Sequence, residues 1–578
     1  MKQTELLPYI MLFLASCGGS HPVQEQETVT ATTVAAPITM CTPPPTSDTL
    51  WYTQNSKAPL FDGLEGAHFD LTTSNPEAQR YFDQGLILAY GFNHAEAARS
   101  FYEATRQDST CAMCYWGYSY VLGPNYNAGM EPDNFSRAYR AVQKAKQLAG
   151  NSTPKEKALI LAMEKRYPPE PVDDRAPYDL AYAEALQEVY EQYPSDPDIG
   201  ALYAEARMDL HPWDLWQQNG QPQPWTEEIM SVLQQTIKVH PKHVGANHFY
   251  IHATEASLQP EAANESALLL ETLVPGAGHL LHMPSHTYIR TGNYHAGTVA
   301  NLRAVQADSA YTTTCHAQGA YPLAYFPHNY HFMAATATLE GNSKMAMLGA
   351  EKLAEHVDPR IMETAGWETL QHYYTIPYFV AIKFGKWDHI LQMQNQDSTL
   401  LYPALIRHYA QGMAHLGKND LVRAKAELAR LTELSKQEEL KEMRIWGINS
   451  MHDIARIAQL VLHAEVLAQE EKTEQGVQLL QRAVAVEDSL NYQEPPDWFF
   501  SVRHHLGAVL LQAGQYKEAA EVYKQDLHTL PKNGWALNGL AMAYTGMGEV
   551  NKASQAQKDF ENAWQWADVK LDASRVQQ

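Results

Sequence analysis

The chain has 578 residues, long enough for one repeat array or for roughly two to four ordinary domains. Hydrophobic residues make up 45% of it, so it can bury a sizeable core. Its formal charge of -23 argues against nucleic acid as a partner, because a phosphate backbone attracts basic surfaces. The charge fits a soluble protein that faces neutral or cationic ligands.

The N-terminal residues have the features of an export signal. A lysine at position 2 precedes the apolar run 6–14, which is too short to span a bilayer. The run ends in Leu14-Ala15-Ser16-Cys17, which resembles a bacterial lipobox. This resemblance implies that residues 1–17 are a lipoprotein signal peptide, cleaved before Cys17, and that the Cys17 thiol carries lipid. The alternative is a plain secretion signal with a chance cysteine.

Lipid on Cys17 would make the membrane a partner through the N-terminus alone. We therefore expect the protein in the cell envelope, lipid-anchored at the outer membrane or on its periplasmic face. Residues 18–60 are rich in Thr, Pro, Gln, Ala and Ser, a composition typical of a flexible tether. From about Pro76 to Val569 helical periodicity dominates and strand signals are scarce.

The periodic part repeats itself at about 34 residues. Residues 78–111 place small residues such as Gly85 and Ala97 where two helices would cross, with Phe101 filling the gap. The pattern recurs in residues 500–533 and again from Trp535. It resembles the tetratricopeptide repeat, which implies an all-α fold: a right-handed superhelical solenoid of antiparallel helix pairs. We expect a helical repeat region with a His-rich groove over 61–400 and a tetratricopeptide repeat region over 401–578.

Three segments, 247–256, 278–291 and 327–333, hold histidines three or four positions apart, which puts each set on one helix face. These residues are His248 and His252, His279, His282 and His286, and His328 and His331. Glu255 follows His252 by three positions, and Arg290 continues the stripe beyond His286. Pro284 predicts a kink or a helix start inside the second set.

The repeat frame predicts which way these faces point. In tetratricopeptide repeats the first helix of each pair lines the concave groove. Counting back from the turn glycines Gly292 and Gly341 puts the second and third sets at groove positions. The first set has no turn glycine, so its alignment to the repeat positions can shift by one residue. His372, before Gly385, also takes a groove position.

Imidazoles on facing helices can meet on one ion, because neighbouring helices pack about 8–10 Å apart. A metal ion needs three or four imidazole or carboxylate ligands, so the seven histidines and Glu255 could hold one or two ions. Such ligands suit copper, zinc or iron, and we favour copper. A metal-free ligand groove and a hydrogen-bonded structural network remain as alternatives.

The enzyme hypothesis is a copper-dependent oxidoreductase in which Glu255 is a ligand or base and Arg290 holds an anionic substrate. Zinc-dependent hydrolysis is a weaker variant. The alternative is a metal-free scaffold that binds a peptide, a protein or a small molecule in the repeat groove. P-loop, Rossmann, Ser-elbow and HExxH motifs are absent from the sequence.

Four cysteines remain if Cys17 is lipidated: Cys41, Cys111, Cys114 and Cys315. They allow three disulfide pairings, and disulfides are permitted outside the cytoplasm. Cys111 and Cys114 form a CxxC pair, which could be a disulfide, a redox pair or half a metal site. A structural disulfide is the default expectation.

The segments CAMCYWG, HMPSH and PHNYHF resemble those of a group of bacterial tetratricopeptide-repeat lipoproteins. This resemblance implies the solenoid architecture and a shared His-rich segment. It implies no particular reaction.

Overall fold

The computed structural model describes residues 49–315, 321–393 and 400–576, and about 68% of it is helical. The predicted all-α solenoid of tetratricopeptide-type helix pairs is confirmed. The expected signal peptide, Cys17 and Cys41 lie outside the described residues. Within the described ranges, no helix is long and apolar enough to cross a membrane.

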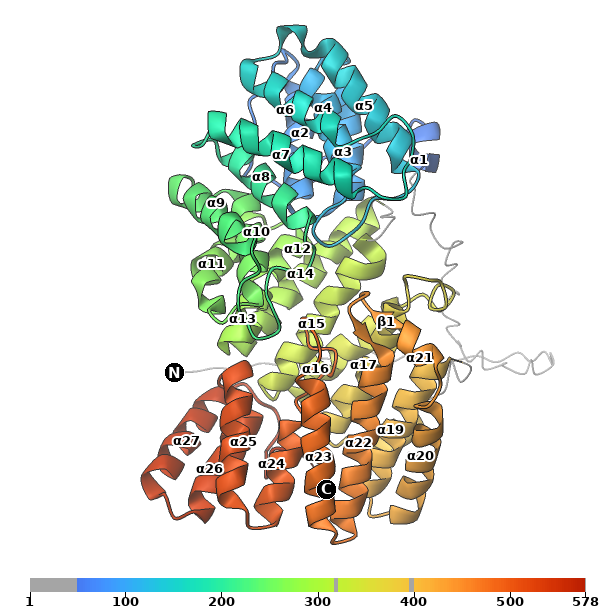
Figure 1. The fold of residues 1–578 in the computed structure, drawn as a ribbon, viewed down its shortest axis with the longest axis vertical. Helices are drawn as coiled ribbons and strands as arrows, with labels where there is room; N and C mark the ends of the chain where they lie inside the picture. Colours follow the sequence, from blue (N-terminus) through green and yellow to red (C-terminus); the bar gives the residue numbers. More distant parts are fainter. Residues whose placement is uncertain (1–48, 316–320, 394–399, 577–578) are drawn as a thin grey trace, which may run out of the picture. The chain divides into compact units, whose positions relative to one another are not determined.

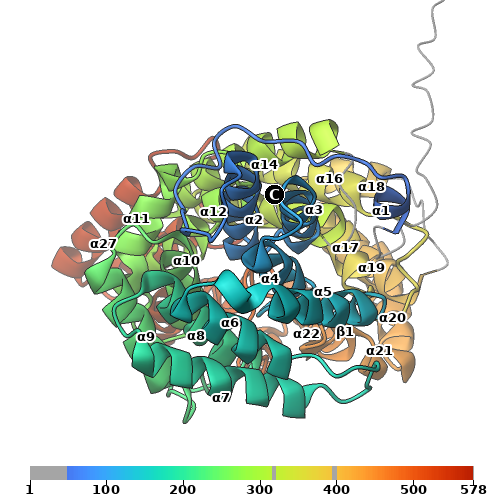
Figure 2. The ribbon, with the colours of Figure 1, turned by 90° about the horizontal axis from the view of Figure 1, so that it is seen from above.

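The N-terminal helices form pairs in which α2 packs on α3, α4 on α5, and α6 on α7 (Figure 1). In Figure 2, α7 and α8 run side by side, and α8 also contacts α9. The elements are α1 (Thr49–Thr53), α2 (Pro76–Tyr90), α3 (His94–Gln107), α4 (Ala112–Val121), α5 (Asn134–Leu148), the 3-10 helix η1 (Ala149–Asn151), α6 (Pro154–Lys165), α7 (Ala176–Gln192), α8 (Pro197–Asp209) and α9 (Thr226–Val239).

Residues 49–60, which composition assigns to the tether, contain α1 and contacts with the repeats. The Tyr52 ring meets that of Tyr102 edge-on at 5.0 Å, and the Tyr81 hydroxyl donates to the buried Ala58 carbonyl. At the start of α4, Cys111 and Cys114 form a disulfide and are both buried.

The middle of the chain contains the predicted histidine-bearing helices, each followed by a partner helix. The elements are α10 (Val244–Glu255), the 3-10 helix η2 (Pro260–Ala263), α11 (Asn264–Leu273), α12 (Gly278–His282), α13 (Pro284–Thr291), α14 (Tyr294–Cys315), the π-helical turn η3 (Tyr321–Tyr325), α15 (Phe326–Leu339), α16 (Ser343–His356), α17 (Thr369–Lys383) and α18 (Trp387–Gln392).

The C-terminal helices pair in the same way, and Figure 1 shows α24 to α27 side by side. A short antiparallel ribbon, β1 with β2, precedes α22. The elements are α19 (Leu401–Gly417), α20 (Leu421–Leu434), α21 (Glu439–Glu442), β1 (Arg444–Ile445), β2 (Asn449–Ser450), α22 (Met451–Gln469), α23 (Thr473–Glu487), α24 (Arg503–Gln512), α25 (Tyr516–Thr529), α26 (Gly534–Gly546) and α27 (Val550–Ala563).

The helix pairs pack through an aromatic ring held between two glycines. Gly507 and Gly539 both face the Tyr523 ring, leaving no room for a Cβ atom at either position. Gly85 and Gly117 hold Phe101 in the same way near the N-terminus. This close approach explains the alternation of small and large residues in the 34-residue pattern.

The predicted turns are also confirmed. Gly292 and Gly341 follow α13 and α15 with φ values of 75° and 82°, a conformation that glycine adopts at little cost. In the first helix pair the corresponding left-handed residue is Phe92, with φ 55°.

The buried apolar side chains form two clusters, one from residues 58–325 and the other from residues 289–556. The two ranges overlap along the chain from the end of α13 through α14 to η3. Of the His-rich helices, α10 belongs to the first cluster, whereas α13 and α15 contribute residues to the second.

Candidate metal centre

Three helical segments bring the predicted histidines together. His248 and His252 lie on α10, and His328 and His331 lie on α15. The second set is divided as Pro284 predicts: α12 ends at His282, and α13 begins at Pro284. Six of these seven histidines are at most 3% exposed, and His328 keeps somewhat more exposure.

Six of the seven histidines form two triads. The first triad is His248, His252 and His279, and the second triad is His282, His286 and His328. Within each triad, one nitrogen from every residue lies within 4.8 Å of the other two. The triads adjoin, since the ring centroids of His252 and His286 are 5.4 Å apart. His331 belongs to neither triad.

Hydrogen bonds orient the rings of the first triad. His248 donates from Nδ1 to the Tyr90 carbonyl oxygen at 2.6 Å. His252 Nδ1 lies 3.0 Å from a Glu255 carboxylate oxygen. Because a carbonyl and a carboxylate accept, both rings carry their proton on Nδ1 and leave Nε2 unprotonated when neutral. Nε2 of His252 has no partner among the described residues.

In the second triad, too, hydrogen-bond acceptors at Nδ1 leave Nε2 of the neutral ring unprotonated. His282 donates from Nδ1 to the side-chain oxygen of Asn301 at 2.7 Å, and the Asn301 amide donates in turn to the Gly297 carbonyl. His286 donates from Nδ1 to Glu255. Nε2 of His282 and Nε2 of His286 then face each other at 2.9 Å. Two lone pairs at this distance repel, so a cation must lie with them: a proton or a metal ion.

One phenylalanine packs against each triad. Phe92 has its ring centroid 4.6 Å from that of His248 and 5.7 Å from that of His279. Phe332 lies 4.7 Å from His282 in the second triad. The unusual backbone of Phe92 therefore serves to bring an apolar ring against the first triad. Both rings are buried and keep water from that side of the imidazoles.

Glu255 is the carboxylate shared by both triads. Although burial opposes its ionisation, electrostatic attraction to His286 and hydrogen bonds from His252 and His286 lower the pKa of Glu255 to about 2. Burial likewise opposes protonation of His286, but Glu255 and Glu494 raise the pKa of His286 to about 9. Glu494 contributes a second carboxylate, with Oε2 3.4 Å from Nδ1 of His286. Without a metal ion, His286 would therefore hold the proton shared with His282.

Burial favours the neutral form of the remaining triad histidines. Burial, followed by the charges of neighbouring histidines, lowers the pKa of His279 and of His282 well below the usual value. The pKa values of His248 and His328 fall for the same reasons. Neutral imidazole is the form that binds metal ions.

Arg290 points to the end of α10. Its guanidinium donates to the carbonyl oxygens of Glu255 at 2.6 Å and Ser257 at 3.4 Å, and it lies over the Tyr492 ring. This tie fixes the backbone of Glu255. The expected contact of Arg290 with an anionic substrate stays a prediction.

Sequence reasoning missed the residues that orient and cover the triads, namely Tyr90, Phe92, Asn301, Phe332 and Glu494. Tyr90 contributes a backbone carbonyl, and Asn301 lies on α14, the second helix of its pair. Only Phe92 carried a signal, because it follows Gly91 in the turn between two predicted helices.

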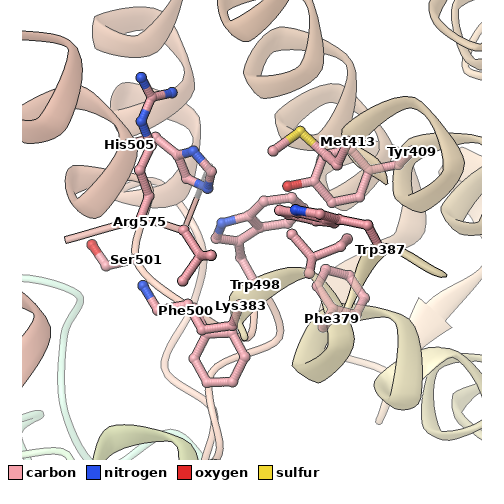
Figure 3. Close-up of a pocket in the computed structure, with 12 residues that line it drawn as sticks. Phe379, Lys383, Trp387, Tyr409, Met413, Trp498, Phe500, Ser501, His505 and Arg575 are labelled. Atoms are coloured by element: carbon pink, nitrogen blue, oxygen red, sulfur yellow. The ribbon is translucent and has the colours of Figure 1, made fainter. Parts of the chain in front are cut away.

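A separate buried polar cluster lies beside a small aromatic cavity of about 30 Å³, shown in Figure 3. Lys383 Nζ donates to His504 Nδ1 at 2.8 Å and to the Ser574 carbonyl at 3.2 Å. His504 Nε2 donates to Asp526 at 2.9 Å. Burial lowers the pKa of Lys383 well below its usual value. The cavity has room for about one water molecule, which is too little for a ligand. The hydrogen bonds of Lys383 with Ser574 and His504 connect the C-terminal segment to α17 and α24.

Comparison with known proteins bears on the repeat architecture. A family model described as tetratricopeptide repeat matches residues 510–566. This part of the chain therefore consists of tetratricopeptide repeats. Repeats of this class suggest a protein-interaction scaffold. No curated protein sequence matches the chain.

Several solved structures are similar to the chain at low sequence identity. The human IFIT1 dimer with m7Gppp-AAAA is 11% identical, with 86% of this chain and 92% of that chain covered and a TM-score of 0.30. The APC/C hetero-tetramer Cut9-Hcn1 is 11% identical, with coverage of 87% and 76% and a TM-score of 0.29. The P58(IPK) TPR domain is 11% identical, with coverage of 86% and 94% and a TM-score of 0.19.

Proposed function

We propose that the two triads each hold one transition-metal ion, with copper favoured and zinc and iron as alternatives. The observation that carries the proposal is the pair of Nε2 atoms of His282 and His286 at 2.9 Å, with both Nδ1 atoms committed to acceptors. A metal ion bound by the second triad would occupy the place that a shared proton otherwise fills.

The donor set fits such ions. Three imidazoles per ion leave a coordination position open, as in catalytic metal sites. The Nδ1 contacts with Tyr90, Asn301 and Glu255 are the kind of outer hydrogen bonds that orient metal-binding histidines. Glu255 would act mainly as the orienting carboxylate for both ions, because it faces the Nδ1 atoms of His252 and His286.

A copper-dependent oxidoreductase is the activity we favour for this site. Bound copper would supply one-electron redox chemistry at each triad. The chain's own residues would hold the imidazoles neutral and exclude water: Phe92 and Phe332 cover the rings, and Glu255 balances charge. Export and lipid attachment at Cys17 belong to this proposal, with the cell envelope as the location.

A second function, binding of a peptide or protein partner, is favoured by a groove in the C-terminal repeats. The groove has a volume of about 800 Å³ and is lined by α24 to α27 and the C-terminal segment. Met542 lines it and is 39% exposed. Most of the residues that line this groove belong to the matched repeat region, so a scaffold role and a metal site can coexist in one chain.

Elemental analysis of the purified protein tests the metal proposal. We expect the triads to hold about two ions per chain after loading with copper, and a loss of metal in His282→Ala and in His286→Ala with helicity unchanged. His240→Ala, at an exposed histidine, is the matched control and should keep both ions. Wild-type protein that holds no metal after loading with copper, zinc or iron would overturn the proposal and leave the scaffold function.

A further inference from the structure

Two buried histidines outside the triads lie close together on neighbouring repeats. His331 lies on α15 and is 3% exposed, and His372 lies on α17 and is fully buried. Their ring centroids are 6.0 Å apart, with the ring planes at 75°. The two helices, α15 and α17, pack directly against each other.

Neither Nε2 atom of the pair has a hydrogen-bond partner among the described residues. His372 is oriented through its other nitrogen, which lies 2.9 Å from the Tyr402 hydroxyl. His331 is held by its ring, which stacks on Phe499 at 5.1 Å with the planes 9° apart. A buried polar atom without a partner is costly, so two such nitrogens on adjacent rings indicate a missing shared ligand.

The spacing of the two rings suits a single ion between them. A metal–nitrogen bond of about 2.0 Å puts the ion about 3.1 Å from a ring centroid. Two rings with centroids 6.0 Å apart lie within twice that distance, so one ion can bind to both rings. Within the triads, the corresponding centroid distances range from 4.8 Å for His282 and His286 to 6.3 Å for His252 and His279.

The side chains around the histidine pair favour an ion of low charge. Apart from the His328 ring, the side chains beside the pair include three apolar or phenolic rings: Phe499 and Tyr373 lie against His331, and Phe379 lies 6.1 Å from His372. The cost of burying an ion rises steeply with its charge, so this environment disfavours a divalent ion with two neutral ligands. Monovalent copper accepts near-linear coordination by two nitrogen ligands.

We propose that His331 and His372 bind one monovalent copper ion between their Nε2 atoms. This site uses nitrogens that belong to neither triad, and it does not require the triads to hold metal. It lies beside the second triad, since the His331 and His328 ring centroids are 6.4 Å apart.

Anaerobic titration of the full chain with monovalent copper, in competition with bicinchoninate, tests the proposal. We expect His331→Ala and His372→Ala each to bind one copper ion fewer than wild type, and His240→Ala to bind as many as wild type. The doubly substituted His252→Ala/His282→Ala protein leaves the pair intact. In this protein, X-ray absorption should show the intense pre-edge transition of two-coordinate monovalent copper, and adding His372→Ala should remove it.

The outcomes separate this site from the triads. Copper binding that depends on His252 and His282 but not on His331 or His372 overturns this inference and leaves the proposed function standing. One two-coordinate copper that depends only on His331 and His372 supports this inference and counts against the triads. The spectrum of the doubly substituted protein decides the matter even if His372→Ala does not fold.

Discussion

The side-chain oxygen of Asn301 lies 2.7 Å from Nδ1 of His282, and it determines which nitrogen of that histidine faces its triad. The amide of Asn301 is itself held, because its nitrogen donates to the Gly297 carbonyl at 2.8 Å. A residue on the second helix of a repeat thus orients a ligand on the first helix of the same repeat.

Replacing Asn301 should therefore weaken the metal site without breaking the fold. In Asn301→Leu the His282 ring loses its acceptor, and we expect copper affinity to fall by about 10–100-fold, as for outer hydrogen bonds elsewhere. Asn301→Asp keeps an acceptor and should bind close to wild type. Chelator competition measures both affinities, and equal affinities for Asn301→Leu and wild type would contradict the role given to Asn301.

Glu255→Gln should affect both ions together. Its two carboxylate oxygens accept from His252 and His286, whereas a glutamine offers one acceptor and one donor. One histidine must then change its tautomer or turn away, so we expect metal content after loading to fall at both triads. Glu261→Gln, at an exposed position on η2, is the control. A Glu255→Gln protein that keeps two ions would show that the carboxylate is dispensable.

The groove histidines could be predicted because i, i+3 and i, i+4 spacings and turn glycines are local features. His282 and His286, for example, follow from the spacing before Gly292. The division into two triads could not be predicted, because it depends on how α12 and α13 separate at Pro284 and on the packing of three repeats. Glu494 reaches His286 from more than 200 positions away, and no spacing rule connects residues so distant.

Packing between the C-terminal repeats gives a prediction independent of the site. A methyl group at Gly507 would collide with the Tyr523 ring, which is buried and held by Ser574. We expect Gly507→Ala to lower the free energy of unfolding by about 1–3 kcal/mol, the usual cost of overpacking. Gly150→Ala, where nothing lies within 4 Å of the added carbon, should change it little. Urea denaturation of the two variants compares them, and equal midpoints would refute the packing argument.

Lipid attachment can be tested at Cys17 in cells. If the lipobox resemblance holds, Cys17→Ala should abolish incorporation of labelled fatty acid and leave the signal peptide uncleaved. Cys315→Ala, at a cysteine far from the signal, should still be labelled. Labelling of Cys17→Ala at the wild-type level would remove the lipoprotein assignment.

Lys383 should give the protein a distinctive dependence of stability on pH. Burial lowers its pKa in the folded state well below the ordinary lysine value of 10.5, so the unfolded chain binds more protons between these two values. Stability then rises with pH in that window, by up to about 1.4 kcal/mol per pH unit from this group. In Lys383→Met the contribution is absent, and the apolar side chain fits beside the Trp535 ring, now 4.0 Å from Nζ. We therefore expect the stability of wild type relative to Lys383→Met to increase as the pH rises toward 10.5.

Denaturant unfolding at several pH values measures this difference. Lys570→Met removes an exposed lysine and serves as the control, with little change expected across the same range. At the lower end of this pH range the methionine variant should be as stable as wild type or more so, because wild type must release the Lys383 proton on folding and the variant has none to release. The His504–Asp526 contact remains in this variant, so helicity should be kept. Parallel pH profiles for wild type and Lys383→Met would mean that Lys383 keeps its proton in the folded protein.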